Sequence, residues 1–203
     1  MDTIALIEGL AATLHAQRER AVAVRALPAD RLAYRPAPDQ WNALEVFEHL
    51  NISSGIYLRG LERVFDDRAD RLPFNASFTP GRLGDYFTRG MLPAQDGTLR
   101  KRMRTLRMFD PARGQGGSPE SIDRFIDLCD RFLRLLQRAR HTDLNRMRVT
   151  SSLGPIIRFK AGDAFRFPIA HQQRHFLQVE RLLAGTAQRA TTNRSTAAPA
   201  RSR

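Results

Sequence analysis

The sequence predicts an all-α fold, namely a four-helix bundle with a long irregular crossover between the second and third core helices. Four segments hold apolar residues at helical spacing, so each has one face to bury. Between the second and third of these segments, residues 69–117 are interrupted repeatedly by proline and glycine. Amphipathic helices that bury their apolar faces against one another form a bundle.

The first helix is predicted from Asp2 or Thr3 to about Val24, where apolar residues recur at helical spacing. Pro28 stops it, and residues 29–40 form a proline-punctuated linker. We expect this linker to be extended or turned, because a residue that precedes proline is pushed out of the helical region.

The second helix has a defined start. Asn42 is a suitable cap, and Glu45 three residues later completes a capping-box pattern. The apolar spacing then continues to Val64. His49 lies on the same face as Ser53 and Tyr57, so the spacing turns it inward.

The crossover, residues 69–117, is expected to pack on the domain as a covering loop, because it holds several aromatic residues. Short helical turns are predicted at Leu83–Thr88 and Thr98–Thr105. A third core helix then begins with Ser118 as cap and Pro119 in the first turn. Its apolar stripe includes Cys129, the single cysteine, which we expect to be a buried and inert thiol.

The final helix is predicted to start near Gly162, with Asp163 as a cap, and to end at Gly185. Pro168 lies either in its first turn or at a kink. Before this helix, residues 147–160 form a connector with a short extended piece. Residues 1–185 are therefore predicted as one four-helix-bundle domain, and residues 186–203 as a disordered tail rich in Ala, Thr and Arg.

Composition favours a cytoplasmic protein and gives no support for a membrane protein. One cysteine permits no internal disulfide, and the first residues lack the pattern of a secretory signal. The net charge of +12 and the basic cluster at residues 100–107 raise the possibility of a nucleic-acid partner. Because most of the arginines are spread along the chain beside acids, we disfavour nucleic acid as the partner.

Three histidines carry the functional prediction. His171 and His175 are spaced i and i+4 on the final helix, which stacks them on one face. If that helix faces the second one, His49 joins them, and three neutral imidazoles form a site for a divalent metal such as Zn, Ni, Fe or Mn. Residue 172 is Gln, so the zinc-protease motif with its glutamate base is absent. Histidines that serve only as core or surface residues are the alternative.

Other residues near these histidines are also candidates for a role at the site. Glu45 lies one turn before His49, and could orient that histidine or serve only in the capping box. Gln178 could bond a metal-bound water or satisfy a contact in the core. Trp41 is expected to be a packing anchor rather than a substrate platform, and Tyr57 is a candidate proton donor. The sequence assigns no catalytic residue.

Two segments, Trp41-Asn42-Ala43-Leu44-Glu45-Val46-Phe47-Glu48-His49-Leu50 and Ala170-His171-Gln172-Gln173-Arg174-His175-Phe176-Leu177-Gln178, resemble the DinB/YfiT-like superfamily. That resemblance implies a four-helix bundle, a homodimer, and a divalent metal held by His49, His171 and His175. It also implies, for some members, thiol-cofactor-dependent transfer. The chain is thus predicted to be a metal-dependent transferase or hydrolase acting on a small-molecule thiol or electrophile. A non-catalytic metal-binding or stress-related interaction protein and a basic nucleic-acid-associated protein are the alternatives.

Overall fold

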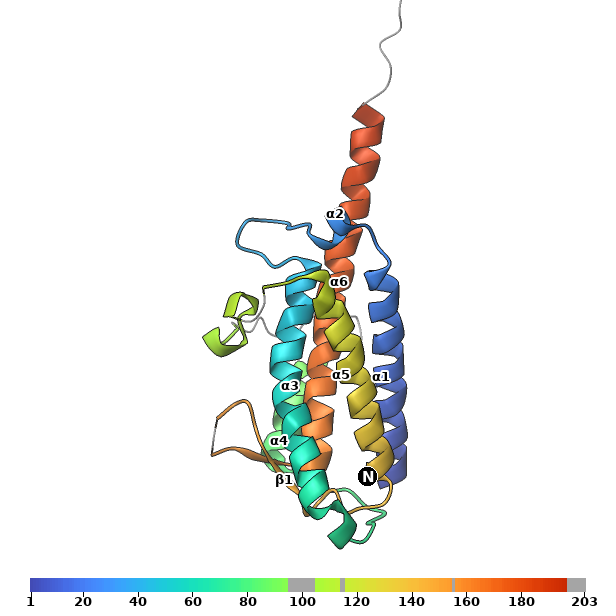
Figure 1. The fold of residues 1–203 in the computed structure, drawn as a ribbon, viewed down its shortest axis with the longest axis vertical. Coiled ribbons are helices and arrows are strands. Elements are labelled where there is room, and N and C mark those ends of the chain that lie inside the picture. Colours follow the sequence, from blue (N-terminus) through green and yellow to red (C-terminus); the bar gives the residue numbers. More distant parts are fainter. Residues whose placement is uncertain (95–104, 114–115, 155, 197–203) are drawn as a thin grey trace, which may run out of the picture.

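Four long helices form the core: α1 (Thr3–Arg25), α3 (Ala43–Arg68), α5 (Pro119–Ala139) and α6 (Ala161–Thr196). The structure is a computed structural model, and it describes residues 1–94, 105–113, 116–154 and 156–196. In Figure 1 the four helices lie side by side, with α1 and α6 running one way and α3 and α5 the other. The predicted all-α bundle is confirmed.

The direction of α5 explains why the crossover is long. Because α3 and α5 are parallel, the chain must return along the bundle before α5 can begin (Figure 1). The 26 residues of α3 span about 39 Å at the usual helical rise. The returning chain carries four short elements within its described part: η1 (Ala69–Arg71), α4 (Arg82–Met91), η2 (Arg107–Phe109) and η3 (Pro111–Arg113).

The predicted helix starts are confirmed by their capping bonds. Asp2 caps α1, since its Oδ1 accepts from the N–H of Ala5 at 2.7 Å. At α3 the capping box is complete: Asn42 Oδ1 accepts from the N–H of Glu45 at 2.9 Å, and Glu45 Oε2 accepts from the N–H of Asn42 at 2.9 Å. Pro119 is the first residue of α5. These bonds satisfy backbone donors that the first turn leaves without partners.

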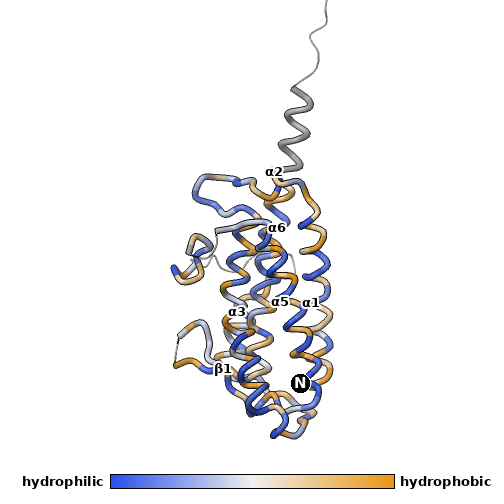
Figure 2. Tube along the Cα trace, in the orientation of Figure 1, coloured by the Kyte–Doolittle hydropathy of each residue, from blue (hydrophilic) through white to orange (hydrophobic). Residues whose placement is uncertain are grey.

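The core between the helices is aromatic and aliphatic. Phe47 of α3, Phe125 of α5 and Phe176 of α6 meet there, with ring centroids 5.3–5.8 Å apart. Cys129 is fully buried in the same core, as the sequence predicts. Figure 2 shows hydrophobic and hydrophilic residues alternating along each helix, the pattern of a face that turns to the core.

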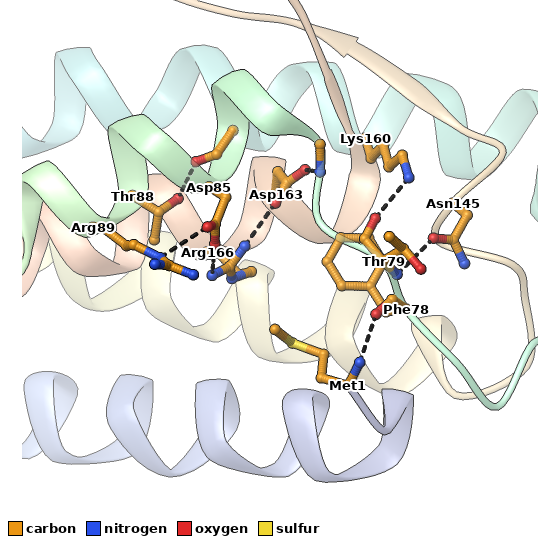
Figure 3. Close-up of polar contacts among 12 residues, drawn as sticks. Met1, Phe78, Thr79, Asp85, Thr88, Arg89, Asn145, Lys160, Asp163 and Arg166 are labelled. Atoms are coloured by element: carbon orange, nitrogen blue, oxygen red, sulfur yellow. Dashed lines mark hydrogen bonds and ion pairs between the residues drawn. The ribbon is translucent and has the colours of Figure 1, made fainter.

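A polar network fastens the crossover to α6 (Figure 3). Arg166 donates to Asp163 on its own helix and to Asp85 on α4, each at 2.8 Å. Asp163 also accepts from the N–H of Gly81 at 2.7 Å. The approach is close enough that a Cβ at Gly84 would meet Asp163 Cγ at 2.5 Å, so glycine is required there. The crossover therefore packs on the domain, as expected.

Several predicted boundaries need correction. The linker contains a short helix, α2 (Ala29–Leu32), with Pro28 as its N-cap residue. The predicted turn at Leu83–Thr88 is present within α4, whereas most of Thr98–Thr105 lies outside the described residues. The extended connector is a hairpin of β1 (Arg148–Thr150) and β2 (Arg158–Lys160), in antiparallel register.

The prediction for α6 is correct near its start, except that Asp163 is not the cap, and it is wrong at the end of the helix. The helix starts at Ala161, so Asp163 lies in its first turn and serves the contact with the crossover instead of capping. It also continues through Gly185 to Thr196, and Gly185 lacks the positive φ of a glycine cap. Pro168 lies inside the helix. The division at residue 185 stays a prediction, and residues 197–203 are outside the described part.

Among the described residues, none of the helices is both long enough and apolar enough to span a lipid bilayer.

Candidate metal centre

The three predicted histidines meet at one point between α3 and α6. Their candidate ligand atoms all lie within 4.8 Å of one another. His171 Nε2 is 3.4 Å from His49 Nε2 and 3.1 Å from His175 Nε2. Two of the ligands come from consecutive turns of α6, and packing of α3 against α6 brings in the third.

The two separations from His171 fit nitrogens that bind the same ion. Metal–nitrogen bonds of about 2.0–2.1 Å, at angles between octahedral and tetrahedral, place neighbouring nitrogens about 2.8–3.4 Å apart. The two separations of 3.1 and 3.4 Å fall in that range. The predicted metal-site residues are therefore brought together in a geometry that suits a divalent ion.

The other ring nitrogen of two histidines is already committed. His49 Nδ1 lies 2.8 Å from the carbonyl oxygen of Phe109, and His175 Nδ1 lies 2.9 Å from Gln178 Oε1. Because both partners are acceptors, each Nδ1 carries the hydrogen and each Nε2 presents a lone pair to the centre. His171 can donate one Nε2–H to only one of the two lone pairs facing it. A cation at the centre would be bound by the Nε2 lone pairs of all three histidines.

The histidines are held in the neutral form that binds metals. Desolvation, with a smaller contribution from His49, lowers the pKa of His175 to about 3. Desolvation and then the neighbouring His175 place the pKa of His171 well below its ordinary value. For His49, desolvation lowers the pKa, while the bond to Phe109 and the charge of Asp110 oppose the shift.

Packing fixes the His49 ring on both sides. Trp41 lies against it, with ring centroids 5.0 Å apart, and Phe109 approaches edge-on at 6.4 Å. Trp41 is thus a packing residue, as expected. Glu45 does not orient His49, because its carboxylate is used by the Asn42 capping box and by Arg35, whose Nη2 donates to it at 2.6 Å.

A cavity of about 110 Å³ adjoins the three histidines, and we call it the inner chamber. Tyr57 and Ser53 line it, as the shared helix face predicts. Tyr57 Oη lies 2.8 Å from Ser151 Oγ and accepts from the N–H of Ser152 at 3.2 Å. Desolvation raises the pKa of Tyr57, so the phenol keeps its proton. The crossover supplies one wall, through Met91, Thr105, Leu106 and Phe109.

A second, more open cleft of about 610 Å³ lies beside the chamber, and we call it the outer cleft. Among the described residues, the chamber and the cleft share three that line both: Thr105, Arg174 and His175. The outer cleft is also lined by Pro36, Asp39, Gln40, Trp41, Gln178, Arg181 and Leu182. The histidine centre therefore lies beside the boundary between the inner chamber and the larger, more open outer cleft.

Sequence reasoning missed two participants. The Phe109 carbonyl orients His49, and a backbone carbonyl has no sequence signature. Arg174 lines both spaces, and its position directly before His175 could have drawn attention to it. His15 and His141 are exposed, as expected for histidines without a role at the centre.

Comparison with known protein families gives a match. The model of the DinB superfamily matches residues 13–179, a span that includes all three histidines. No curated protein and no solved structure matches the chain.

Proposed function

The chain belongs to the DinB superfamily, and on that premise we propose that it binds a divalent metal ion through His49, His171 and His175. The observation that carries this proposal is the convergence of three Nε2 atoms, two of them oriented by acceptors at Nδ1. Zn, Ni, Fe and Mn all accept such imidazole ligands to different degrees.

We further propose that the bound metal serves chemistry, in a thiol-cofactor-dependent transferase or a hydrolase. Structural zinc sites are normally closed by four protein ligands, whereas catalytic sites keep a position open. Among the described residues, the three histidines are the only group of His, Cys, Asp or Glu side chains close enough together to hold an ion. The inner chamber opens beside them. When bound, the metal would supply a Lewis acid that lowers the pKa of a coordinated thiol or water.

The chain's own residues would prepare that site. Phe109 and Gln178 hold two of the imidazoles in their metal-binding orientation. Met91 and Leu106 line the chamber with apolar surface. Tyr57 presents a protonated phenol within the chamber, in bonding distance of Ser151 and Ser152, and is the candidate to donate a proton.

The alternatives receive less support. A metal that only ties α3 to α6 would not need the adjoining chamber. A nucleic-acid role would need arginines available to phosphates, yet many pair with acids of this chain, such as Arg18 with Asp130 and Arg131 with Glu62. The homodimer and the cytoplasmic location expected from the sequence stay part of the proposal.

Turnover assays test the catalytic part directly. Protein without an affinity tag would be loaded separately with Zn, Ni, Fe or Mn and mixed with low-molecular-weight thiols and electrophilic substrates. We expect turnover that depends on the metal and is lost in His171→Ala. Stoichiometric metal without turnover across the thiol panel would favour the non-catalytic alternative.

A further inference from the structure

Two adjacent serines of α3 line the inner chamber, and their hydroxyls are used differently. Ser53 Oγ donates to the carbonyl oxygen of His49, one turn earlier on the helix, at 2.8 Å. This is a common bond of a serine inside a helix. Ser54 Oγ instead accepts from Nε2 of Gln172, on α6, at 3.1 Å. Ser54 is only 1% exposed, and the described residues provide no acceptor for its own O–H. A buried hydroxyl with an uncommitted hydrogen calls for an explanation.

The orientation of the Gln172 amide decides whether that hydrogen is available. Gln172 is fully buried, and among the described residues its Oε1 has no hydrogen-bond partner. Turning the amide over would let Ser54 donate to Oε1, but it would leave both N–H donors of a buried amide without acceptors. Buried donors without partners are rarer than buried acceptors without partners. Gln172 therefore donates to Ser54, and the Ser54 O–H stays free for another acceptor.

The other hydroxyls of the inner chamber are already committed or lie at its edge. Ser53 bonds the carbonyl of His49, while Tyr57 and Ser152 bond each other. Thr105 is exposed and lines the outer cleft as well. Ser54 is therefore the buried hydroxyl, among the described lining residues, that has a hydrogen to donate into the chamber.

Much of the remaining lining is apolar. Six of the described lining residues are hydrocarbon or thioether side chains: Met91, Leu106, Phe109, Leu153, Phe167 and Pro168. A hydroxyl without an acceptor in such surroundings is costly, and a ligand that brings one acceptor removes the cost. The same surroundings favour an acceptor on an otherwise apolar group.

The size of the inner chamber limits that group further. Its volume is about 110 Å³, whereas an apolar cavity of roughly 150 Å³ is enough to hold benzene. The chamber therefore has room for a short chain or a small ring. The larger outer cleft, at about 610 Å³, can take any remainder of the ligand.

We propose that Ser54 donates a hydrogen bond to a carbonyl oxygen of the ligand, carried on a small and largely apolar group that fills the inner chamber. Gln172 is the positioning residue, because its N–H holds Ser54 Oγ and leaves the hydroxyl hydrogen for the ligand. This assignment rests on the small-molecule chemistry proposed above, and it identifies the substrate class as carbonyl compounds.

Infrared spectroscopy of bound cyclopentanone, a small ring ketone, tests this assignment without an activity assay. The C=O stretch of a ketone falls in frequency when the oxygen accepts a hydrogen bond. Zinc-loaded and metal-free wild type would each be saturated with the probe. We expect a bound C=O band below its frequency in hexane. In Ser54→Ala the band should rise toward that frequency, and the affinity for the probe should fall by about 2- to 10-fold, the range for loss of one neutral hydrogen bond.

Ser53→Ala is the matched control. It removes the same group from the neighbouring residue, whose hydroxyl already donates to the carbonyl of His49, so the band should keep its wild-type frequency. An equal frequency in the wild type and Ser54→Ala would overturn the role of Ser54. A band that moves on zinc loading but not in Ser54→Ala would show that the metal, and not Ser54, binds the carbonyl.

Gln172→Leu tests the positioning role. Without the amide N–H, the Ser54 hydroxyl can turn back to a carbonyl of its own helix. The bound band should then rise part of the way to the value in Ser54→Ala. A wild-type frequency in Gln172→Leu would reject the role of Gln172.

The unaltered chain covers the case in which Ser54→Ala does not fold, because a bound band at the hexane frequency in the wild type would contradict the proposal by itself. The zinc content of the same samples reports on the metal site separately. Protein that holds zinc but binds no cyclopentanone would reject the carbonyl site alone. Protein that holds no zinc would instead reject the proposed metal site.

Discussion

His49 Nδ1 lies 2.8 Å from the carbonyl oxygen of Phe109, so a residue of the long crossover orients a candidate metal ligand on α3. The crossover is therefore part of the site as well as a connection between parallel helices. It returns the chain to the start of α5, walls the inner chamber and fixes one imidazole.

This relationship predicts that the metal affinity depends on the packing of η2. Phe109→Ala should weaken metal binding about 10- to 100-fold, the usual cost of disturbing a residue that orients a ligand. Phe109 is 7% exposed and contacts the His49 ring, whereas its neighbour Met108 is 53% exposed. Met108→Ala is thus the matched control and should bind metal normally. Competition with a chromogenic chelator would measure both, and equal affinities would show that the Phe109 side chain is not needed to hold its carbonyl against His49.

Gln178 should act through its oxygen. Gln178→Leu removes the acceptor for His175 Nδ1–H and is expected to lower metal affinity about 10- to 100-fold. Gln178→Glu keeps an acceptor at that position and should restore most of the affinity. Calorimetric titration with Zn would measure the series. If Gln178→Glu proved as weak as Gln178→Leu, the hydrogen bond would not be the cause.

The metal-free protein should lose stability in mild acid. His175 has a pKa of about 3 in the folded chain, against an ordinary value near 6.5 in an unfolded chain. Between these values the unfolded state binds more protons, so the contribution is intact above about pH 6.5 and declines as the pH falls toward 3. Urea unfolding of chelator-treated protein at several pH values would measure this.

The control for that experiment is a histidine outside the site. His175→Gln should flatten part of the pH dependence, while His141→Gln, which changes an exposed residue, should leave it as in the wild type. Identical profiles for the wild type and His175→Gln would show that the depressed pKa does not contribute.

The network between α4 and α6 should be a main support of the crossover. Asp163 is fully buried and bonds both Arg166 and the N–H of Gly81. Asp163→Ala leaves these donors without that partner and should cost about 3 kcal/mol of unfolding free energy. Asp127→Asn, at an exposed pair 3.8 Å from Arg131, should cost less than about 0.5 kcal/mol. Denaturant unfolding would compare them, and a similar small cost for both would argue against a structural network.

Cys129 should be unreactive in the native protein. The thiol is buried, and desolvation raises its pKa, so it stays protonated at neutral pH. Ellman's reagent should react with it only after unfolding in urea. Rapid reaction of the native protein would contradict the packed core around α5.

Spacing and caps made much of this structure predictable. The His171–His175 interval defines a helix face by itself, and the Asn42–Glu45 pattern places His49 in register on α3. The site also required one long-range assumption, that α3 faces α6, and the bundle supplies it. These predictions succeeded because each depends on local geometry plus a single packing arrangement.

What sequence could not predict depends on contacts between distant segments. Every residue has a backbone carbonyl, so nothing in the sequence marks that of Phe109 as the partner of His49. Only the folded crossover brings this carbonyl to the imidazole. Asp163 lies where the sequence predicts a helix cap. In the folded chain its carboxylate instead accepts a hydrogen bond from the N–H of Gly81. Gly185 ends a helix only if it adopts a left-handed conformation, and here it does not.

The central claim, that three histidines hold one divalent ion, is tested most directly by metal analysis of protein purified without an affinity tag. We predict about one equivalent of a divalent metal per chain, a loss of melting temperature on chelation, and loss of the bound metal in His49→Ala, His171→Ala and His175→Ala but not in His15→Ala. Absence of metal after incubation with Zn, Ni, Fe and Mn, together with a melting temperature that chelation leaves unchanged, would contradict the claim.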